Sequence, residues 1–174
     1  NYQHTVSPDF HQTRGHSGSY VIPLPWRDLL TLSAAYSEIE PDMAPPFHRE
    51  GTSWQLGLRY DHDLPPLGPF RHAVGAMFEH KMSDNNLLFS DIPVTDNRTD
   101  ILQFSGLYTA GLADPWGSTE VRLRLTGSPG GLTDHNGTRA FEISRTFAEA
   151  DYFYGVLDLS RLQRLPLGFA LAVS

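Results

Sequence analysis

The feature that most constrains this chain is a strict alternation of apolar and polar side chains between Trp54 and Asp61. Successive side chains of an extended strand point to opposite faces, so this segment has two unlike faces. One face is wholly apolar with an aromatic ring at each end, and it consists of Trp54, Leu56, Leu58 and Tyr60. The other face carries Gln55, Gly57, Arg59 and Asp61. A soluble sheet can alternate in this way, but aromatic residues at both ends are typical of a strand that crosses a membrane.

The same kind of alternation recurs along the chain and predicts nine strands. They are expected at residues 2–6, 15–24, 30–37, 54–61, 72–81, 102–112, 120–126, 152–162 and 169–174. The longest loop region, 128–147, is expected to contain one further short strand at 140–144. No stretch of ten or more residues has a helical period. Strands at this spacing predict an all-β fold, an antiparallel up-and-down meander.

The connections between these strands alternate in length. Short turns are predicted at 23–28, 64–69, 114–117 and 163–167, and long loops at 38–51, 83–99 and 128–147. Short periplasmic turns at one end and long extracellular loops at the other are the layout of outer-membrane barrels. Residues 1–174 are therefore predicted to be part of one transmembrane β-barrel domain, about nine strands of a larger barrel.

If the apolar face meets lipid, the opposite face lines a water-filled lumen. Charged side chains are costly against hydrocarbon, whereas a wet barrel interior tolerates them and uses them to tune what passes. The residues expected to face this lumen are Gln55, Arg59, Asp61, Glu79, Lys81, Gln103, Glu120, Arg122 and Arg124. The alternative is an ordinary solvated face whose scattered charges have no specific role.

Composition narrows the class of protein further. The 174 residues suffice for one domain, and the net charge of −7 argues against a general nucleic-acid surface. Charged residues make up 19% of the chain, which is somewhat low for a soluble domain, and aromatic residues make up 11%, which is somewhat high. The chain has no cysteine, which excludes disulfide scaffolds and cysteine-based zinc or redox sites. No run of about 18 apolar residues occurs, so no transmembrane helix is predicted.

Histidines and short motifs do not form a recognisable catalytic or metal site in the sequence. The eight histidines lie in different predicted strands and loops without ligand spacing: His4, His11, His16, His48, His62, His72, His80 and His135. Ser17 misses the G-x-S-x-G nucleophile elbow by one position. The segment 134–137 lacks the spaced carboxylates of a calcium loop. No catalytic, cofactor-binding or metal-binding residue is therefore predicted, and the protein is expected not to be an enzyme.

Several short motifs follow one another in a recognisable order. They are YVIPLPW (20–26), LTLSAAYSE (30–38), GTSWQLGLRY (51–60), SDNNL (83–87), DPWGS (114–118), SPGGL (128–132) and LSRLQRLP (159–166). In this order and spacing the chain resembles the barrel domain of two-partner secretion transporters, the haemolysin secretion and activation family. The resemblance covers most of the chain, and the SPGGL stretch is its most specific part.

The resemblance implies a sixteen-stranded outer-membrane barrel preceded by two periplasmic POTRA domains, which bind an unfolded exoprotein. It also implies a long loop with an Arg-Gly-Tyr motif that folds back into the pore. This chain would hold about the third to the eleventh strand. Because residues 2–6 and 169–174 at the two ends already look like strand, we interpret the chain as an excerpt of a longer protein. Nine strands cannot close a sixteen-stranded barrel, so this piece alone is not expected to fold into a working pore.

The resulting prediction is an outer-membrane transporter that moves an unfolded exoprotein outward in two-partner (type V) secretion, without a cofactor. Its expected partners are the secreted exoprotein and outer-membrane lipid, with no nucleic acid, and its expected location is the bacterial outer membrane. A passive porin-like channel is one alternative and would lack POTRA domains. A soluble all-β binding domain is another, with the apolar face as a sandwich core. A barrel hydrolase is a third and would depend on one serine.

Overall fold

A computed structural model describes residues 1–6, 13–40, 47–89, 92–95, 97–166 and 169–174. One helix, α1 (Thr138–Ser144), accompanies ten strands. The strands are β1 (Tyr2–Val6), β2 (Thr13–Pro23), β3 (Leu29–Ile39), β4 (Phe47–Asp63), β5 (Phe70–Phe89), β6 (Ile92–Thr95), β7 (Arg98–Asp114), β8 (Gly117–Pro129), β9 (Asp151–Arg164) and β10 (Ala170–Val173).

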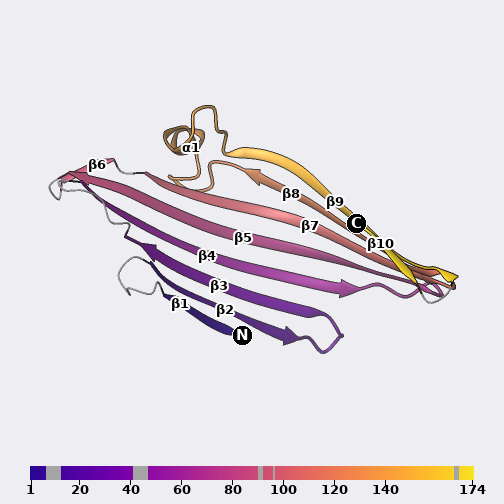
Figure 1. Cartoon of the computed structure of the whole chain (residues 1–174). Coiled ribbons are helices and arrows are strands. Elements are labelled where there is room, and N and C mark those ends of the chain that lie inside the picture. The colour runs from indigo at the N-terminus through magenta and orange to yellow at the C-terminus, as the bar shows by residue number, and fades with distance from the viewer. Residues whose placement is uncertain (7–12, 41–46, 90–91, 96, 167–168) are drawn as a thin grey trace.

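The strands form one curved, twisted sheet whose order follows the sequence (Figure 1). The path is β1-β2-β3-β4-β5-β7-β8-β9-β10, and each strand is antiparallel to its neighbours. Strand β6 folds back on the end of β5 and lies off this path. The predicted nine-strand antiparallel meander is therefore confirmed. Among the described residues β1 and β10 do not pair with each other, so the sheet is open.

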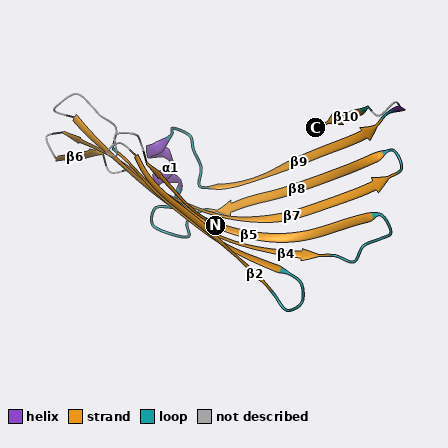
Figure 2. Ribbon diagram, turned by 60° about the horizontal axis from the view of Figure 1, so that its bottom comes forward, coloured by secondary structure: helices purple, strands orange, loops and turns teal. Residues whose placement is uncertain are grey.

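Short turns lie at one end of the sheet, which we call the turn end, and the long segment between β8 and β9 lies at the other, the loop end (Figure 2). Residues 24–28, 64–69 and 115–116 connect β2 to β3, β4 to β5 and β7 to β8. These three short turns are as predicted. The predicted turn at 163–167 includes residue 167, and the predicted loop at 38–51 includes residues 41–46. These positions lie outside the described residues. The described ends of both segments are strand rather than turn or loop, because β9 continues to Arg164, β3 continues to Ile39 and β4 begins at Phe47.

The predicted long loop at 83–99 is wrong, because strands occupy most of it. Strand β5 continues to Phe89 and β7 begins at Arg98, with Ser83 paired to Thr99 and Asp84 to Arg98. Residues 83–86 are polar on both faces, and the apolar Leu87, Leu88 and Phe89 follow one another directly, so this segment has no alternating apolar period to read. Backbone pairing with neighbouring strands does not need that period, and it extends the sheet beyond the alternating region.

The predicted short strand at 140–144 is also wrong, because this segment belongs to the helix α1. Strand β8 is already paired with β7 on one side and β9 on the other, so it offers no free edge to an added strand. A helix satisfies its backbone groups within its own segment. The seven-residue α1 is the one helix in the described part of the chain, and it is too short to cross a membrane.

The register sorts the strand side chains into two faces. On the first, which we call the apolar face, Tyr20, Leu32, Leu58, Phe78 and Phe104 form one row across five strands. The second, the polar face, carries the residues on the opposite side of the same strands. Burial is inverted relative to a soluble domain, in which apolar side chains fill the core. The buried polar side chains on the polar face are Glu79, Gln103, Ser105, Thr126 and Ser128, whereas Ala110 and Ala150 are the only buried hydrophobic residues among those described.

Candidate functional site

All nine residues predicted to face a lumen share the polar face. The register places Gln55 opposite Lys81, and Glu79 opposite Gln103. Arg59 and Asp61 follow Gln55 on the same side of β4 because strand side chains alternate with period two. Glu120, Arg122 and Arg124 pair with Gly111, Thr109 and Leu107 of β7, which lie on the same side as Gln103. The sequence therefore identified a set of residues that the fold brings to one surface.

Glu79 is the centre of a hydrogen-bonded network on this face. The side chain is buried, and its carboxylate accepts hydrogen bonds from Gln55 (Nε2–Oε1, 3.0 Å) and from the Gln103 amide. The Lys81 ammonium lies 3.2 Å from Oε1 and supplies the opposite charge. Tyr152 donates its hydroxyl to the Gln103 oxygen at 2.9 Å. A buried carboxylate is tolerated because it is both paired and hydrogen-bonded.

Most of the remaining charges of the set are neutralised in pairs, and the two partners of each pair lie on the same strand. Arg59 holds the Asp61 carboxylate with two nitrogens, Nε and Nη2, at 2.8–3.0 Å. Arg122 donates to a single oxygen of Glu120, Oε1, from Nη2 at 2.6 Å and from Nε at 3.0 Å. Partners two residues apart meet because they lie on the same side of the strand. Arg124 has no carboxylate partner among the described residues.

The polar face changes character from one edge of the sheet to the other. On β2 and β3 it carries small hydroxyl side chains, among them Ser17, Ser19, Thr31, Ser33 and Ser37. Ser37 is hydrogen-bonded to Ser53 of β4 at 2.8 Å. From β4 to β8 the polar face carries instead the Glu79 network and the arginine–carboxylate pairs. The face therefore has a neutral hydroxyl region beside a charged region.

The sequence-based set missed several polar-face residues that make side-chain contacts, and two of them are buried. Ser105 and Thr126 join their hydroxyls across β7 and β8 at 2.8 Å, and both side chains are buried. Tyr152 and Tyr154 stack on β9 with ring centroids 6.0 Å apart. The alternation of β9 placed Tyr154 on this face, but only the register of β8 with β9 brings Tyr152 within reach of Gln103.

The apolar face carries exposed large hydrophobic side chains on each strand of the nine-strand path, although the small Ala110 on the same face is buried. Tyr20 is 68% exposed, Phe153 75% and Leu157 66%. Following the register from β1 to β10, no Asp, Glu, Lys or Arg projects from the central part of this face in the described strands. The charged residues with this orientation lie near the strand ends, and they include Arg14, Glu38, Asp100, Asp114 and Arg161.

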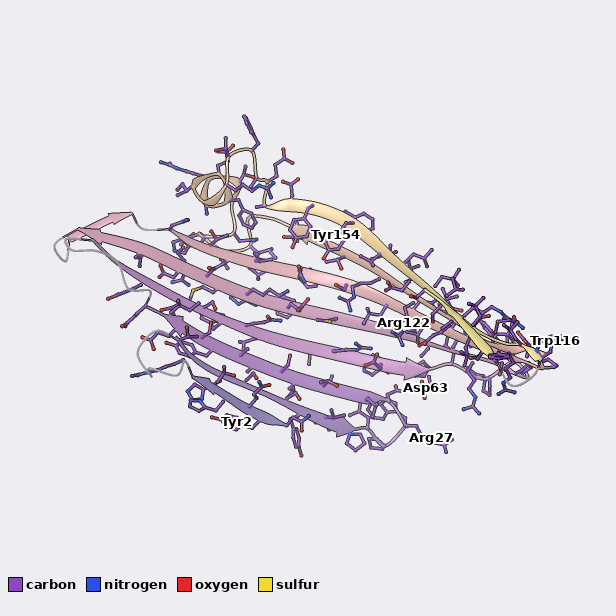
Figure 3. The ribbon with its side chains drawn as sticks, viewed as in Figure 1. Tyr2, Arg27, Asp63, Trp116, Arg122 and Tyr154 are labelled. Atoms are coloured by element: carbon purple, nitrogen blue, oxygen red, sulfur yellow. The ribbon has the colours of Figure 1, made fainter. Side chains whose placement is uncertain are left out.

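At the turn end, the apolar face is bordered by ion pairs and aromatic rings. Arg161 contacts the Asp114 carboxylate at 2.8 Å, the Thr119 hydroxyl at 2.6 Å and the Gln163 oxygen at 2.8 Å. The hydrogen bond from Arg161 holds the pKa of Asp114 below its usual range, and the backbone N–H of Trp116 adds to this effect. Figure 3 shows Trp116 at this end of the sheet, with Arg27 and Asp63 also lying toward it.

Asp28, in the turn between β2 and β3, is a second polar group at the turn end. Its side chain is buried, the Tyr60 hydroxyl donates to one carboxylate oxygen, and the His62 Nδ1 lies 2.7 Å from the other. The Tyr60 hydrogen bond is the main reason why the pKa of Asp28 lies below its usual range, and His62 contributes in the same direction. Burial opposes the shift but does not outweigh it.

At the loop end, the histidines of the apolar face meet aromatic partners and one another. His4 and His16 face each other across β1 and β2, with their Nδ1 atoms 3.2 Å apart. The hydroxyl oxygen of Tyr2 lies 2.8 Å from the Nδ1 atom of His16. The ring of His80 packs edge-on against Trp54. The described residues include no group of three or more histidine, aspartate or glutamate side chains that could hold a metal ion. His11 lies outside the described residues.

Taken together, the geometry is a broad two-sided wall rather than a catalytic cleft. One side offers paired charges, amides and hydroxyls to water, and the other offers a charge-free apolar surface with polar and aromatic borders. Such a wall can separate an aqueous path from an apolar medium. No family model, no curated protein and no solved structure matches this chain.

Proposed function

We propose that this sheet is part of the wall of a bacterial outer-membrane β-barrel, with the apolar face toward lipid and the polar face toward a water-filled lumen. The observation that carries the proposal is the inverted burial. Buried side chains of the sheet are mostly polar, and the exposed central surface is apolar and free of charge. Outer-membrane strands alternate in this sense, apolar outward and polar inward.

The extent of the apolar face supports this orientation. Soluble monomers rarely expose a contiguous apolar patch larger than a few hundred Å², and here exposed apolar side chains occur on strands from β2 to β10. A soluble sandwich would cover the face with a second sheet. The described residues form a single sheet, so that cover would have to come from another chain or segment.

The height of the apolar region also fits a membrane. On β7 the apolar face runs without a charge from Leu102 to Leu112, between Asp100 and Asp114. A tilted strand needs roughly 9–11 residues to cross the hydrocarbon core. The aromatic borders, with Trp54 toward the loop end and Trp116 at the turn end, match the preference of Trp for the two water–lipid boundaries.

An open sheet cannot remain open in a bilayer, because unpaired edge groups would face hydrocarbon. Strands β1 and β10 are therefore proposed to pair with further strands, either from elsewhere in the same protein or from another copy. A larger closed barrel leaves a water-filled channel.

The proposed task of this channel is to pass an unfolded exoprotein outward in two-partner secretion. The ordered motifs from YVIPLPW to LSRLQRLP support this assignment, because they resemble that family. The polar face is consistent with it, because most of its charges are paired and its first strands carry small hydroxyls. Such a surface offers an extended chain hydrogen-bonding groups without a strong fixed site.

The test uses the full-length gene product in its native host. We expect it to fractionate with the outer membrane, and we expect deletion of its gene to stop secretion of a large exoprotein encoded nearby. Outer-membrane location with normal secretion would replace the transporter by a passive porin-like channel. A water-soluble, monomeric product would contradict the membrane assignment itself.

A further inference from the structure

The segment between β8 and β9 folds over the polar face instead of extending away from the sheet. It leaves β8 through Gly130 and Gly131, whose φ angles of 65° and 66° are left-handed and favour glycine. It returns beside its own start, because Pro129 pairs with Asp151 and the buried Ala150 packs against Gly130. The segment is thus a closed loop with a fixed base.

Asn136 anchors the first half of this loop to β7. Its side chain is fully buried, and Nδ2 donates to the backbone oxygen of Asp100 at 2.9 Å while Oδ1 accepts from the backbone N–H of Leu132. The Thr133 hydroxyl donates to the Asp100 carboxylate at 3.0 Å. The backbone N–H of Asp100 donates to the backbone oxygen of His135 at 3.0 Å. These bonds occupy the edge of β7 beyond the end of β8.

The second half of the loop, including α1, forms a roof above the polar face at the loop end (Figure 1). Thr99, which is on the polar side of β7, donates its hydroxyl to the Ala140 oxygen of α1. A cavity of about 690 Å³ separates the roof from the sheet. Phe141, Arg145 and Ala148 line it from above, and Gln55 and Lys81 are among the residues that line it from below.

The floor of the cavity is held by the Glu79 network. Gln55 and Lys81 both direct their head groups to the Glu79 carboxylate, which fixes their side chains against the sheet. The loop that carries the roof is anchored to β7 through the hydrogen bond between Asn136, in its first half, and Asp100. Floor and roof therefore have separate, ordered supports. The residues that line the space between them include the cations Lys81 and Arg145 and the aromatic Phe141 of the roof.

From this arrangement we propose that the β8–β9 loop is the constriction of the lumen, and that Phe141 and Arg145 contact the polypeptide that passes through it. The proposal rests on the proposed function, because it assigns the narrowest part of the same aqueous path. The material recognised is an extended polypeptide. Its backbone would meet the amide and hydroxyl groups of the floor, and its acidic side chains would meet Arg145 and Lys81.

The lack of cysteine in this chain allows a sharp test with single introduced thiols. The full-length protein, with any cysteine elsewhere replaced, is reconstituted in planar lipid bilayers as Phe141→Cys and as Phe147→Cys. Phe141 lines the cavity, whereas Phe147 of the same loop is 92% exposed and lines no part of this cavity. Each channel is then treated with a small, negatively charged methanethiosulfonate reagent.

We expect a stepwise loss of conductance on modification of the cysteine at position 141 and no change at position 147. Conductance that is unchanged at both positions, or equally reduced at both, would overturn the constriction while leaving the channel intact. The absence of any conductance in the unmodified protein would overturn the proposed channel and the constriction together.

A second variant tests the anchor rather than the lining. Asn136→Ala removes the side-chain hydrogen bonds that hold the roof to Asp100, so we expect a higher mean conductance and more frequent transitions between levels. The matched control is Asp134→Ala, an exposed residue of the same loop. Equal behaviour of Asn136→Ala and Asp134→Ala would contradict the anchoring role of Asn136.

Discussion

The two faces of this sheet are built from adjacent residues of the same strands, yet they have opposite chemistry. On β4, Gln55 reaches into the Glu79 network, while its neighbour Leu56 is 50% exposed on the apolar face. On β8, Arg122 holds Glu120, while Leu123 points to the other side. One face is cohesive because its polar groups satisfy one another, and the other has no partner within the described residues.

Within the described residues, the pattern of burial is the reverse of that in a typical soluble domain. In a soluble domain the apolar face would be the core and the polar face would be the surface. Here hydrogen bonds hold the side chains of the polar face together, and the hydrophobic side chains of the apolar face have no covering partner among the described residues. A substitution should therefore have different effects on the two faces, and the following variants of the full-length protein measure that difference.

The largest difference is expected between Leu56→Arg and Gln55→Arg. An arginine at a lipid-facing position near the middle of a barrel strand costs about 2–4 kcal/mol, whereas lumen positions tolerate it. We expect Leu56→Arg to lower the amount of protein in the outer membrane and its free energy of unfolding from lipid vesicles in urea. Gln55→Arg should lower both much less. Equal and small effects would mean that Leu56 faces water.

The next largest effect is expected at Glu79 on the polar face. Glu79→Leu leaves the amide groups of Gln55 and Gln103 without their acceptor and Lys81 without its counter-charge, which costs about 1–3 kcal/mol for a buried group. The measurement is again the urea unfolding free energy in vesicles. If the unfolding free energy falls by no more than it does when an exposed ion pair is removed, water replaces the missing carboxylate and the network is accessible to solvent.

The border of the apolar face should respond to pH through Asp114. Its folded-state pKa is lowered, mainly by the hydrogen bond from Arg161, so the folded state favours the ionised carboxylate. This contribution is fully present above the unfolded-state pKa of about 3.9 and is lost as the pH falls through the lower folded-state value. We expect the stability of the wild type to fall in this acid range, and we expect Asp114→Asn to flatten that part of the profile.

Urea midpoints measured at several pH values would check this expectation. The pKa of Asp28 is also lowered, so the acid profile of the urea midpoint of Asp28→Asn is compared with that of Asp114→Asn. If Asp114→Asn and the wild type have the same acid profile, the bond to Arg161 does not contribute to stability in the membrane.

The smallest effect is expected for the exposed pair on the polar face. Glu120→Gln removes the charge that Arg122 contacts, but both side chains are open to water, so the loss should be within about 0.2–1 kcal/mol. The conductance of the reconstituted channel should become more anion-selective, because Arg122 loses its counter-charge. A loss of stability as large as that of Glu79→Leu would mean that the two parts of the polar face are equally sheltered.

Much of the fold was predictable because it depends on local periodicity. The alternation on β4, β5, β7 and β8 placed every lumen candidate on one side, and proline and glycine marked the short turns at 64–69 and 115–116. The loop end was not predictable in the same way. Residues 83–86 of β5 are polar on both sides and three consecutive apolar residues follow them, so no alternation marks this end of the strand. The helix α1 arises where no strand edge is free.

The sequence by itself determined which residues alternate, which side of each strand they occupy and where the short turns fall, because these properties repeat within a few residues. Only the tertiary structure decided that Glu79 lies between Gln55 and Gln103, that Asn136 reaches Asp100, and that α1 covers the polar face. These contacts join residues that are far apart in the chain. They depend on the register of neighbouring strands, and a shift of one residue would reverse every face.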